Sequence, residues 1–87
     1  MNRERIEHDE RFKINLNNLE IGRRIARGRM SLGIAQEDMA AEIGVSRQWL
    51  SYVENGRRPV RVSLLPKIAQ RLEVSIDYLV TGQLKPR

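Results

Sequence analysis

The chain has 87 residues, of which 16 are Lys or Arg and 11 are Asp or Glu, so its formal net charge is +5. This length predicts one small domain, and the lack of cysteine excludes disulfides and thiolate metal sites. No apolar run approaches the roughly 20 residues of a membrane span, and the charged N-terminus lacks a signal-peptide core, which predicts a soluble cytoplasmic protein.

The positive charge is unevenly placed along the chain. Residues 1–17 carry four basic and four acidic side chains, whereas residues 18–87 carry twelve basic and seven acidic ones. A basic domain behind a balanced arm indicates a polyanionic partner. Many small proteins are basic for solubility alone, so charge by itself leaves both interpretations open.

Residues 1–17 are predicted to form an N-terminal arm. Phe12, Ile14 and Leu16 alternate with polar residues, as in a short strand that could take part in dimerisation. Three alternations fit a disordered arm equally well. His8, the only histidine, is interpreted as a solvated arm residue.

Capping and breaking residues divide residues 18–82 into five predicted helices, followed by a tail at residues 83–87. The predicted helices span residues 19–31, 36–43, 47–55, 64–72 and 76–81. Their expected N-terminal caps are Asn18, Ala35, Ser46, Ser63 and Ser75, of which Ala35 is a poor capping residue. Because the links are short, apart from a loop at residues 56–62, the sequence predicts an all-α, compact five-helix bundle.

The first predicted helix has two distinct faces at about 100° per residue. Its apolar face is formed by Ile21, Ile25, Gly28 and Leu32. Its opposite, polar face is formed by Arg23, Arg24, Arg27 and Ser31.

The third predicted helix also separates apolar from polar residues, but its polar side is unusual. Trp49, Leu50 and Val53 form the apolar face. The opposite flank is formed by Arg47, Gln48, Ser51, Tyr52 and Asn55. An ordinary solvated face usually mixes Glu and Lys, whereas this flank has no acid and consists of hydrogen-bonding groups.

The spacing between Gln36 and Val53 favours two helices that meet steeply across a tight turn. Ala40 leaves room for the second helix, and Gly44 can adopt the positive φ of the corner. Ile21 to Gly82 resembles the phage repressor, Cro and xenobiotic-response-element-type helix-turn-helix regulators. The matching segments are "IGRRIARGRMSLGIAQEDMAAEIGVS", "ENGRRP", "LPKIAQRLEVS" and "IDYLVTG".

This resemblance implies a lambda-repressor-like domain that binds operator DNA, usually as a symmetric dimer. The residues implied to read bases from the major groove are Arg47, Gln48, Ser51 and Tyr52. The residues implied to contact phosphates are Gln36, Ser46, Asn55, Arg57, Arg58 and Arg61. The chemistry agrees, because Arg pairs bidentately with guanine and Gln with adenine, while phosphate contacts position the protein.

Other residues are expected to have structural roles. The resemblance implies a partly buried ion pair between Arg29 and Glu54, and Trp49 is expected to pack rather than to stack on DNA. At Ala35 the family usually has Thr or Ser, so one possible phosphate-binding hydroxyl is missing. The dimerisation candidates, besides the arm, are Ile76, Tyr78, Leu79 and Val80.

The sequence therefore predicts a DNA-binding transcriptional regulator, with repression of a palindromic operator as the expected outcome. The alternative is an antitoxin or adaptor that uses the same fold to bind a partner protein. No enzyme, metal site or cofactor is expected, because no catalytic constellation, metal-ligand cluster or phosphate-cradling glycine loop occurs.

Overall fold

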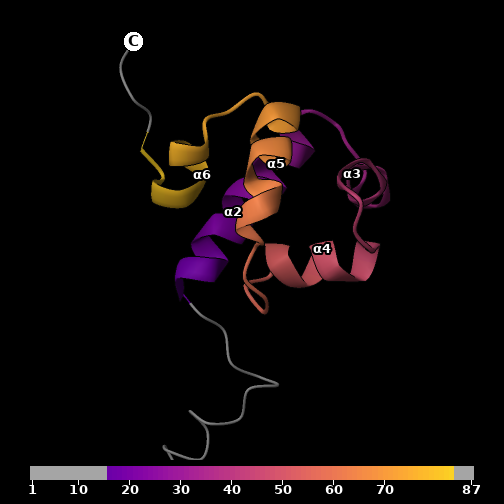
Figure 1. The fold of residues 1–87 in the computed structure, drawn as a ribbon, viewed down its shortest axis with the longest axis horizontal. Coiled ribbons are helices and arrows are strands. Elements are labelled where there is room, and N and C mark those ends of the chain that lie inside the picture. The colour runs from indigo at the N-terminus through magenta and orange to yellow at the C-terminus, as the bar shows by residue number, and fades with distance from the viewer. Residues whose placement is uncertain (1–15, 84–87) are drawn as a thin grey trace, which may run out of the picture.

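The computed structural model describes residues 16–83, and all regular structure in this range is helical. The elements are α2 (Leu16–Ser31), α3 (Gln36–Ile43), α4 (Arg47–Glu54), the 3-10 turn η1 (Val62–Leu64), α5 (Leu65–Leu72) and α6 (Ile76–Thr81) (Figure 1). The predicted all-α fold with five helices is confirmed. No helix within residues 16–83 is long and apolar enough to cross a membrane.

The first helix begins earlier than predicted. Leu16 and Asn17, which were assigned to the arm, belong to α2, so Asn18 lies inside the helix and is not its cap. The N-terminal part of α2 lies close to the loop after α4, since a Cβ on Gly56 would lie only 2.8 Å from the Cα of Leu19. His8, Phe12 and Ile14 lie outside the described residues.

The fourth predicted helix differs at its start. Ser63 was expected to cap it, but Ser63 lies inside η1, and α5 begins at Leu65 with no side-chain cap. Pro66 occupies the first turn of α5, where its missing N–H costs nothing. The 3-10 turn therefore leads directly into α5.

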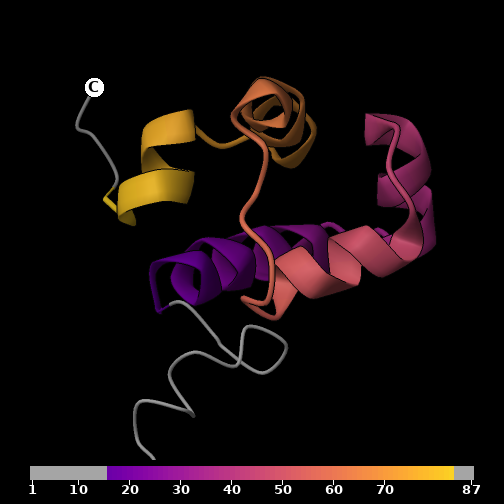
Figure 2. The ribbon, with the colours of Figure 1, turned by 60° about the horizontal axis from the view of Figure 1, so that its bottom comes forward.

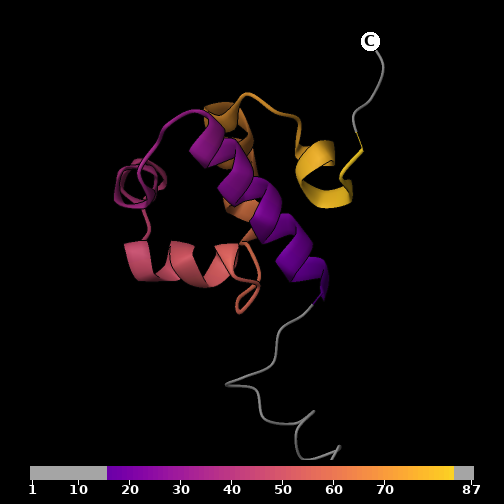
Figure 3. The same ribbon diagram turned by 180° about the vertical axis from the view of Figure 1, so that it is seen from behind.

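The long helix α2 is the centre of the arrangement. It contacts α4, α5 and α6, while α3 contacts α4. Figure 2 shows α4 lying alongside α2, with α5 and α6 on another side of α2. From both faces of the molecule, α3 and α6 lie at opposite ends (Figures 1 and 3).

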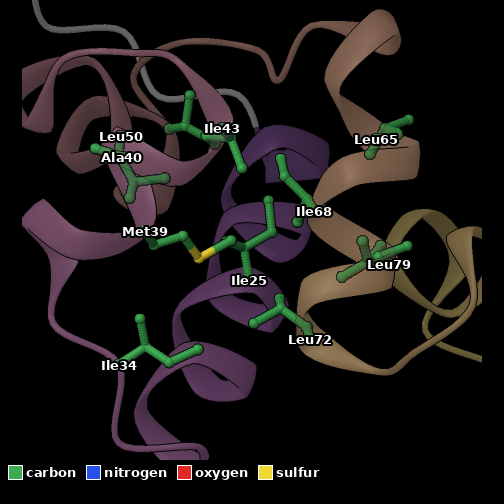
Figure 4. Close-up of a cluster of buried hydrophobic side chains, with 12 residues drawn as sticks. Ile25, Ile34, Met39, Ala40, Ile43, Leu50, Leu65, Ile68, Leu72 and Leu79 are labelled. Atoms are coloured by element: carbon green, nitrogen blue, oxygen red, sulfur yellow. The ribbon is translucent and has the colours of Figure 1, made fainter.

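All five helices contribute to one hydrophobic core. Ile25, Leu50, Ile68 and Leu79, from α2, α4, α5 and α6, have no exposed surface, and Met39 of α3 points toward Ile25 (Figure 4). The remaining core residues are Ile34, Ala40, Ile43, Val53, Leu65, Ala69 and Leu72. Burial of this apolar surface fixes how the helices pack.

Two residues assigned to the faces of the first predicted helix lie elsewhere than expected. Leu32 follows the end of α2 and is 43% exposed, and Ile34 is buried in the core instead. Arg24 does not face solvent freely, because its Nη1 donates to the carbonyl oxygens of Leu79 at 2.8 Å and Val80 at 3.3 Å. These carbonyls belong to the last turn of α6, where a cation is favourable.

Candidate nucleic-acid interface

A tight turn at residues 44–46 joins α3 to α4. Gly44 has a φ of 82°, and the N–H of Val45 donates to the carbonyl of Ala40 at 2.9 Å, which closes the end of α3. The hydroxyl of Ser46 then accepts the N–H of Trp49 at 3.0 Å and caps α4. In Figure 1, α3 is seen end-on while α4 lies across the view, so the two helices meet steeply.

One side of α4 is anchored in the core. Leu50 and Val53 are buried, and Trp49 is half-buried and packs against the core. The guanidinium carbon of Arg61 lies 4.8 Å from the centre of the Trp49 ring, within the range of a cation–π interaction. Trp49 thus packs as predicted, and it also holds an arginine of the loop after α4.

A buried ion pair joins α2 to the end of α4. Glu54 has only 6% of its side chain exposed, and its two oxygens accept from Nε and Nη2 of Arg29 at 2.8 and 3.0 Å. Nη1 of Arg29 donates to the carbonyl of Ile34 at 2.9 Å. The hydrogen bond to Glu54 raises the pKa of Arg29 further above its ordinary value, so this guanidinium stays charged.

The second partner of Glu54 comes from α3. Nε2 of Gln36 donates to Oε1 of Glu54 at 2.9 Å. Gln36 was expected to brace a phosphate, but in this structure its side-chain amide is directed to the ion pair. The pair and Gln36 together connect α2, α3 and α4 at one point.

The polar flank of α4 is accessible to solvent. Arg47, Gln48 and Asn55 are exposed, and Ser51 and Tyr52 are half-buried. A shallow hollow on this flank is lined by Ser51, Tyr52, Asn55 and Arg57.

Three contacts order this flank. Nε2 of Gln48 donates to the hydroxyl of Tyr52 at 2.9 Å, and the guanidinium carbon of Arg58 lies 5.4 Å from the centre of the Tyr52 ring. Nδ2 of Asn55 donates to the carbonyl of Ser51 at 2.8 Å. Base-reading and phosphate-contacting candidates therefore lie together along one edge of α4.

The loop after α4 carries its arginines next to this edge. Arg57, Arg58 and Arg61 are all exposed, and the N–H of Arg57 donates to the carbonyl of Tyr52 at 2.9 Å. None of the three forms an ion pair with an acid among residues 16–83. Arg58 lies over Tyr52 and Arg57 lines the hollow, so these two charges are available to an anion beside the polar flank, whereas Arg61 lies over Trp49.

The dimerisation candidates on α6 divide into two groups. Leu79 is fully buried in the core, and Tyr78 is half-buried against it, so both stabilise the single chain. Leu79 is thus corrected from an interface residue to a core residue. Ile76 and Val80 remain 40% and 44% exposed, and they lie one helical turn apart.

Sequence reasoning missed the contacts that depend on residues far apart in the chain. Arg24 and Leu79 are 55 positions apart, and Gln36 and Glu54 are 18 apart. Gly22 was also missed, although a Cβ there would lie 2.0 Å from the carbonyl oxygen of Val53. The absence of a side chain at position 22, inside an otherwise regular helix, was the available signal.

Comparison with known proteins agrees with this geometry. A model of the helix-turn-helix family matches residues 25–79. The uncharacterized HTH-type transcriptional regulator y4dJ of Sinorhizobium fredii is 44% identical over 61 residues, which cover 70% of this chain and 79% of that protein. An uncharacterized transcriptional regulator in the ATPase CF(0) region of Rhodospirillum rubrum is 41% identical over 58 residues, or 67% of this chain and 54% of that protein.

A solved structure has the same arrangement of helices. The restriction-modification controller protein C.AhdI from Aeromonas hydrophila superposes with a TM-score of 0.69 at 28% sequence identity. The match covers 75% of this chain and 98% of that one.

Proposed function

Because the chain belongs to the helix-turn-helix family of DNA-binding transcriptional regulators, we propose that it represses transcription by reading a palindromic operator with α4 in the major groove. The main observation in support of this proposal is the polar flank of α4, which is accessible and has no acidic residue, together with the three arginines of the following loop. Such a regulator acts on the nucleoid in the cytoplasm of a prokaryote or of a phage-infected cell.

The base-reading residues of this proposal lie near the start of α4. Arg47 and Gln48 are exposed and long enough to reach base edges, and Ser51 lies one turn further along. Arg matches O6 and N7 of guanine, and Gln matches N6 and N7 of adenine, each at about 1–3 kcal/mol of discrimination. We therefore expect the half-site to contain a guanine and an adenine at neighbouring positions.

The phosphate contacts are proposed to come from both ends of the motif. Arg57, Arg58 and Arg61 supply charge from the loop after α4. Ser46 and Asn55 are exposed at the two ends of α4. Since the side-chain amide of Gln36 is bonded to Glu54, we assign the phosphate contact at this residue to its backbone N–H in the uncapped first turn of α3.

Two copies are proposed to bind together through α6. Ile76 and Val80 offer an exposed apolar surface at the end of the molecule opposite α3. A two-fold axis there would present two α4 helices to half-sites about 34–36 Å apart, one turn of DNA. The alternative dimerisation segment is the N-terminal arm at residues 1–17.

Selection of bound sequences from a random duplex pool tests the proposal. The expected result is a symmetric site, whose affinity falls by orders of magnitude between low and moderate salt. The variants Arg47→Ala and Gln48→Ala should each lose preference at one position of the half-site. If the two variants weaken binding to all sequences equally, the base-reading assignment is wrong. If the protein has no affinity for duplex DNA, or an affinity that does not depend on salt, the adaptor alternative is favoured.

A further inference from the structure

Tyr52 makes two separate contacts on the exposed edge of α4. Its hydroxyl accepts a hydrogen bond from Gln48 at 2.9 Å, and its ring lies under the guanidinium of Arg58 at 5.4 Å. We propose that Tyr52 is a positioning residue, which aims the base-reading amide of Gln48 with its hydroxyl and the phosphate-contacting Arg58 with its ring. This inference rests on the proposed DNA-binding function, and it replaces base reading as the expected role of Tyr52.

The hydroxyl restrains a side chain that would otherwise be free. Gln48 is exposed and has three rotatable bonds, whereas Tyr52 is half-buried and has two, so the tyrosine is the more rigid partner. The two residues are four positions apart, which places them one above the other on α4. One N–H of the amide is directed to Tyr52, and Oε1 and the second N–H remain for a ligand.

The remaining groups of Gln48 match one base. Adenine presents an acceptor at N7 and a donor at N6 in the major groove, which is the complement of an amide N–H and oxygen. Guanine presents two acceptors there, so an amide held in this orientation satisfies guanine less well. The hydrogen bond from Gln48 to Tyr52 therefore selects adenine by fixing the amide before DNA arrives.

The ring of Tyr52 acts on a different part of the protein. Arg58 extends from the loop after α4, and the backbone of this loop is already tied to Tyr52, because the Tyr52 carbonyl accepts the N–H of Arg57 at 2.9 Å. The aromatic face attracts the guanidinium and reduces its freedom. Arg58 is thereby held on the same side of α4 as Gln48, where its phosphate contact adds affinity without reading the base.

Substitutions can separate the two contacts. Tyr52→Phe removes the hydroxyl and keeps the ring, Arg58→Ala removes the cation and keeps the hydroxyl, and Tyr52→Leu removes both contacts. Tyr78→Phe is the matched control, because it deletes the other tyrosine hydroxyl of the chain from α6, far from the polar flank. Thermal unfolding of each free variant measures whether the fold is retained.

The Gln48→Ala variant first identifies the operator position at which Gln48 determines the base preference. The affinity of each variant is then measured on the selected operator and on a second operator in which adenine at that position is replaced by guanine. We expect Tyr52→Phe to reduce the adenine preference by roughly two- to tenfold, the worth of one hydrogen bond, without changing the salt dependence. Arg58→Ala should keep the preference and lower the slope of log affinity against log salt by about one. Tyr52→Leu should both reduce the adenine preference and lower the slope of the salt dependence. Tyr78→Phe should change neither quantity.

A measurement without DNA addresses the contact directly. In the free protein, the side-chain amide protons of Gln48 should exchange with water more slowly in the wild type than in Tyr52→Phe. Equal exchange, an unchanged adenine preference in Tyr52→Phe, or equal weakening on both operators would each overturn the proposal. If the wild-type protein selects no DNA sequence, the proposed function is refuted, and the positioning role of Tyr52 is overturned with it. Slow exchange of the Gln48 amide protons would in that case still show that the hydrogen bond to Tyr52 exists.

Discussion

Glu54 helps to fix the placement of α4 through hydrogen bonds to two other helices. It is charged and nearly fully buried, yet each of its oxygens has a donor: Nε of Arg29 for one, and Nη2 of Arg29 with the amide of Gln36 for the other. A buried charge is tolerated only when it is paired and hydrogen-bonded in this way. The same carboxylate thus restrains three helices where the polar flank of α4 ends.

Removal of this carboxylate should be costly. Glu54→Ala leaves the guanidinium of Arg29, itself only 13% exposed, without its charged partner, so we expect a loss of about 3–5 kcal/mol in the free energy of unfolding. Urea denaturation monitored by circular dichroism measures this loss.

Glu42 provides the matched control. It pairs with Arg71 at 2.6 Å, a shorter distance than in the buried pair, but both side chains are more than 40% exposed. Glu42→Ala should therefore cost less than about 1 kcal/mol. Equal losses in Glu42→Ala and Glu54→Ala would contradict the view that burial gives the Arg29–Glu54 pair its importance.

At the scale of elements, a glycine permits the close contact between α2 and α4. A Cβ at position 22 would lie 2.0 Å from the carbonyl oxygen of Val53 and 3.0 Å from the Cα of Glu54, which are backbone atoms and have little room to move. Gly22→Ala should therefore destabilise the fold by at least about 1–3 kcal/mol, although alanine is the better helix former.

Gly28 in the same helix distinguishes packing from helix propensity. A Cβ there would meet a methyl group of Leu72 at 3.1 Å, and a side chain can shift slightly. Gly28→Ala should change the unfolding free energy by less than about 1 kcal/mol, because the gain in helix propensity offsets a small strain. Chemical denaturation of both variants checks the comparison, and a stabilised Gly22→Ala would show that α2 and α4 lie further apart than described.

The start of α3 has no side-chain cap. Ala35 occupies the cap position with φ −68° and ψ 149°, nearly the same conformation as Ser46 with φ −76° and ψ 152°, but it has no side-chain hydrogen bond. Ala35→Ser should add a cap worth about 1 kcal/mol and raise the Tm by roughly 4–8 °C. Ser46→Ala should lower the Tm by a similar amount, and an unchanged Tm in Ala35→Ser would mean that the first turn of α3 is already satisfied in another way.

The elements predicted correctly are those set by local signals. The predicted bounds of α4 and α6 lie within one residue of the observed ones. They were set by Ser46 and Gly56 for α4 and by Ser75 and Gly82 for α6, and caps act within one turn of the helix end. The predicted bounds were wrong at the first turn of α2, where the helix packs close to Gly56, and at Ser63, where a 3-10 turn occurs instead. Both are decided by the path of the chain in three dimensions.

The candidate site shows the same division. Periodicity was sufficient to separate the buried residues of α4 from its exposed flank, because the helix repeat alone determines which residues share a face. The hydrogen bond from Gln36 to Glu54 and the contacts of Arg24 with α6 were not predictable, since each depends on how two helices pack. Long side chains of this kind can reach several partners, and only tertiary structure selects one.

At the scale of the whole molecule, α2 links the proposed dimer surface on α6 to α4, the helix proposed to read DNA. Arg24 donates to carbonyls in the last turn of α6 and pairs with Glu20 at 3.6 Å, while the same α2 packs against α4. The position of α6 relative to α4 is therefore set through α2. In a two-fold dimer, this relationship would determine the separation of the two α4 helices, and hence the spacing of half-sites that can be read.

Charge placed on α6 should separate the two copies without unfolding either one. Val80 is 44% exposed, so Val80→Glu keeps the core intact but puts a carboxylate into the proposed apolar interface, where its desolvation is unfavourable. We expect sedimentation equilibrium to show a shift from dimer to monomer, with weaker binding to the full operator and unchanged binding to a half-site. Leu32→Glu, at a residue 43% exposed beyond the end of α2, should leave association unchanged. A wild-type chain that is monomeric at high concentration, both free and on the operator, would exclude a dimer, and equal dissociation by the two substitutions would place the interface elsewhere than on α6.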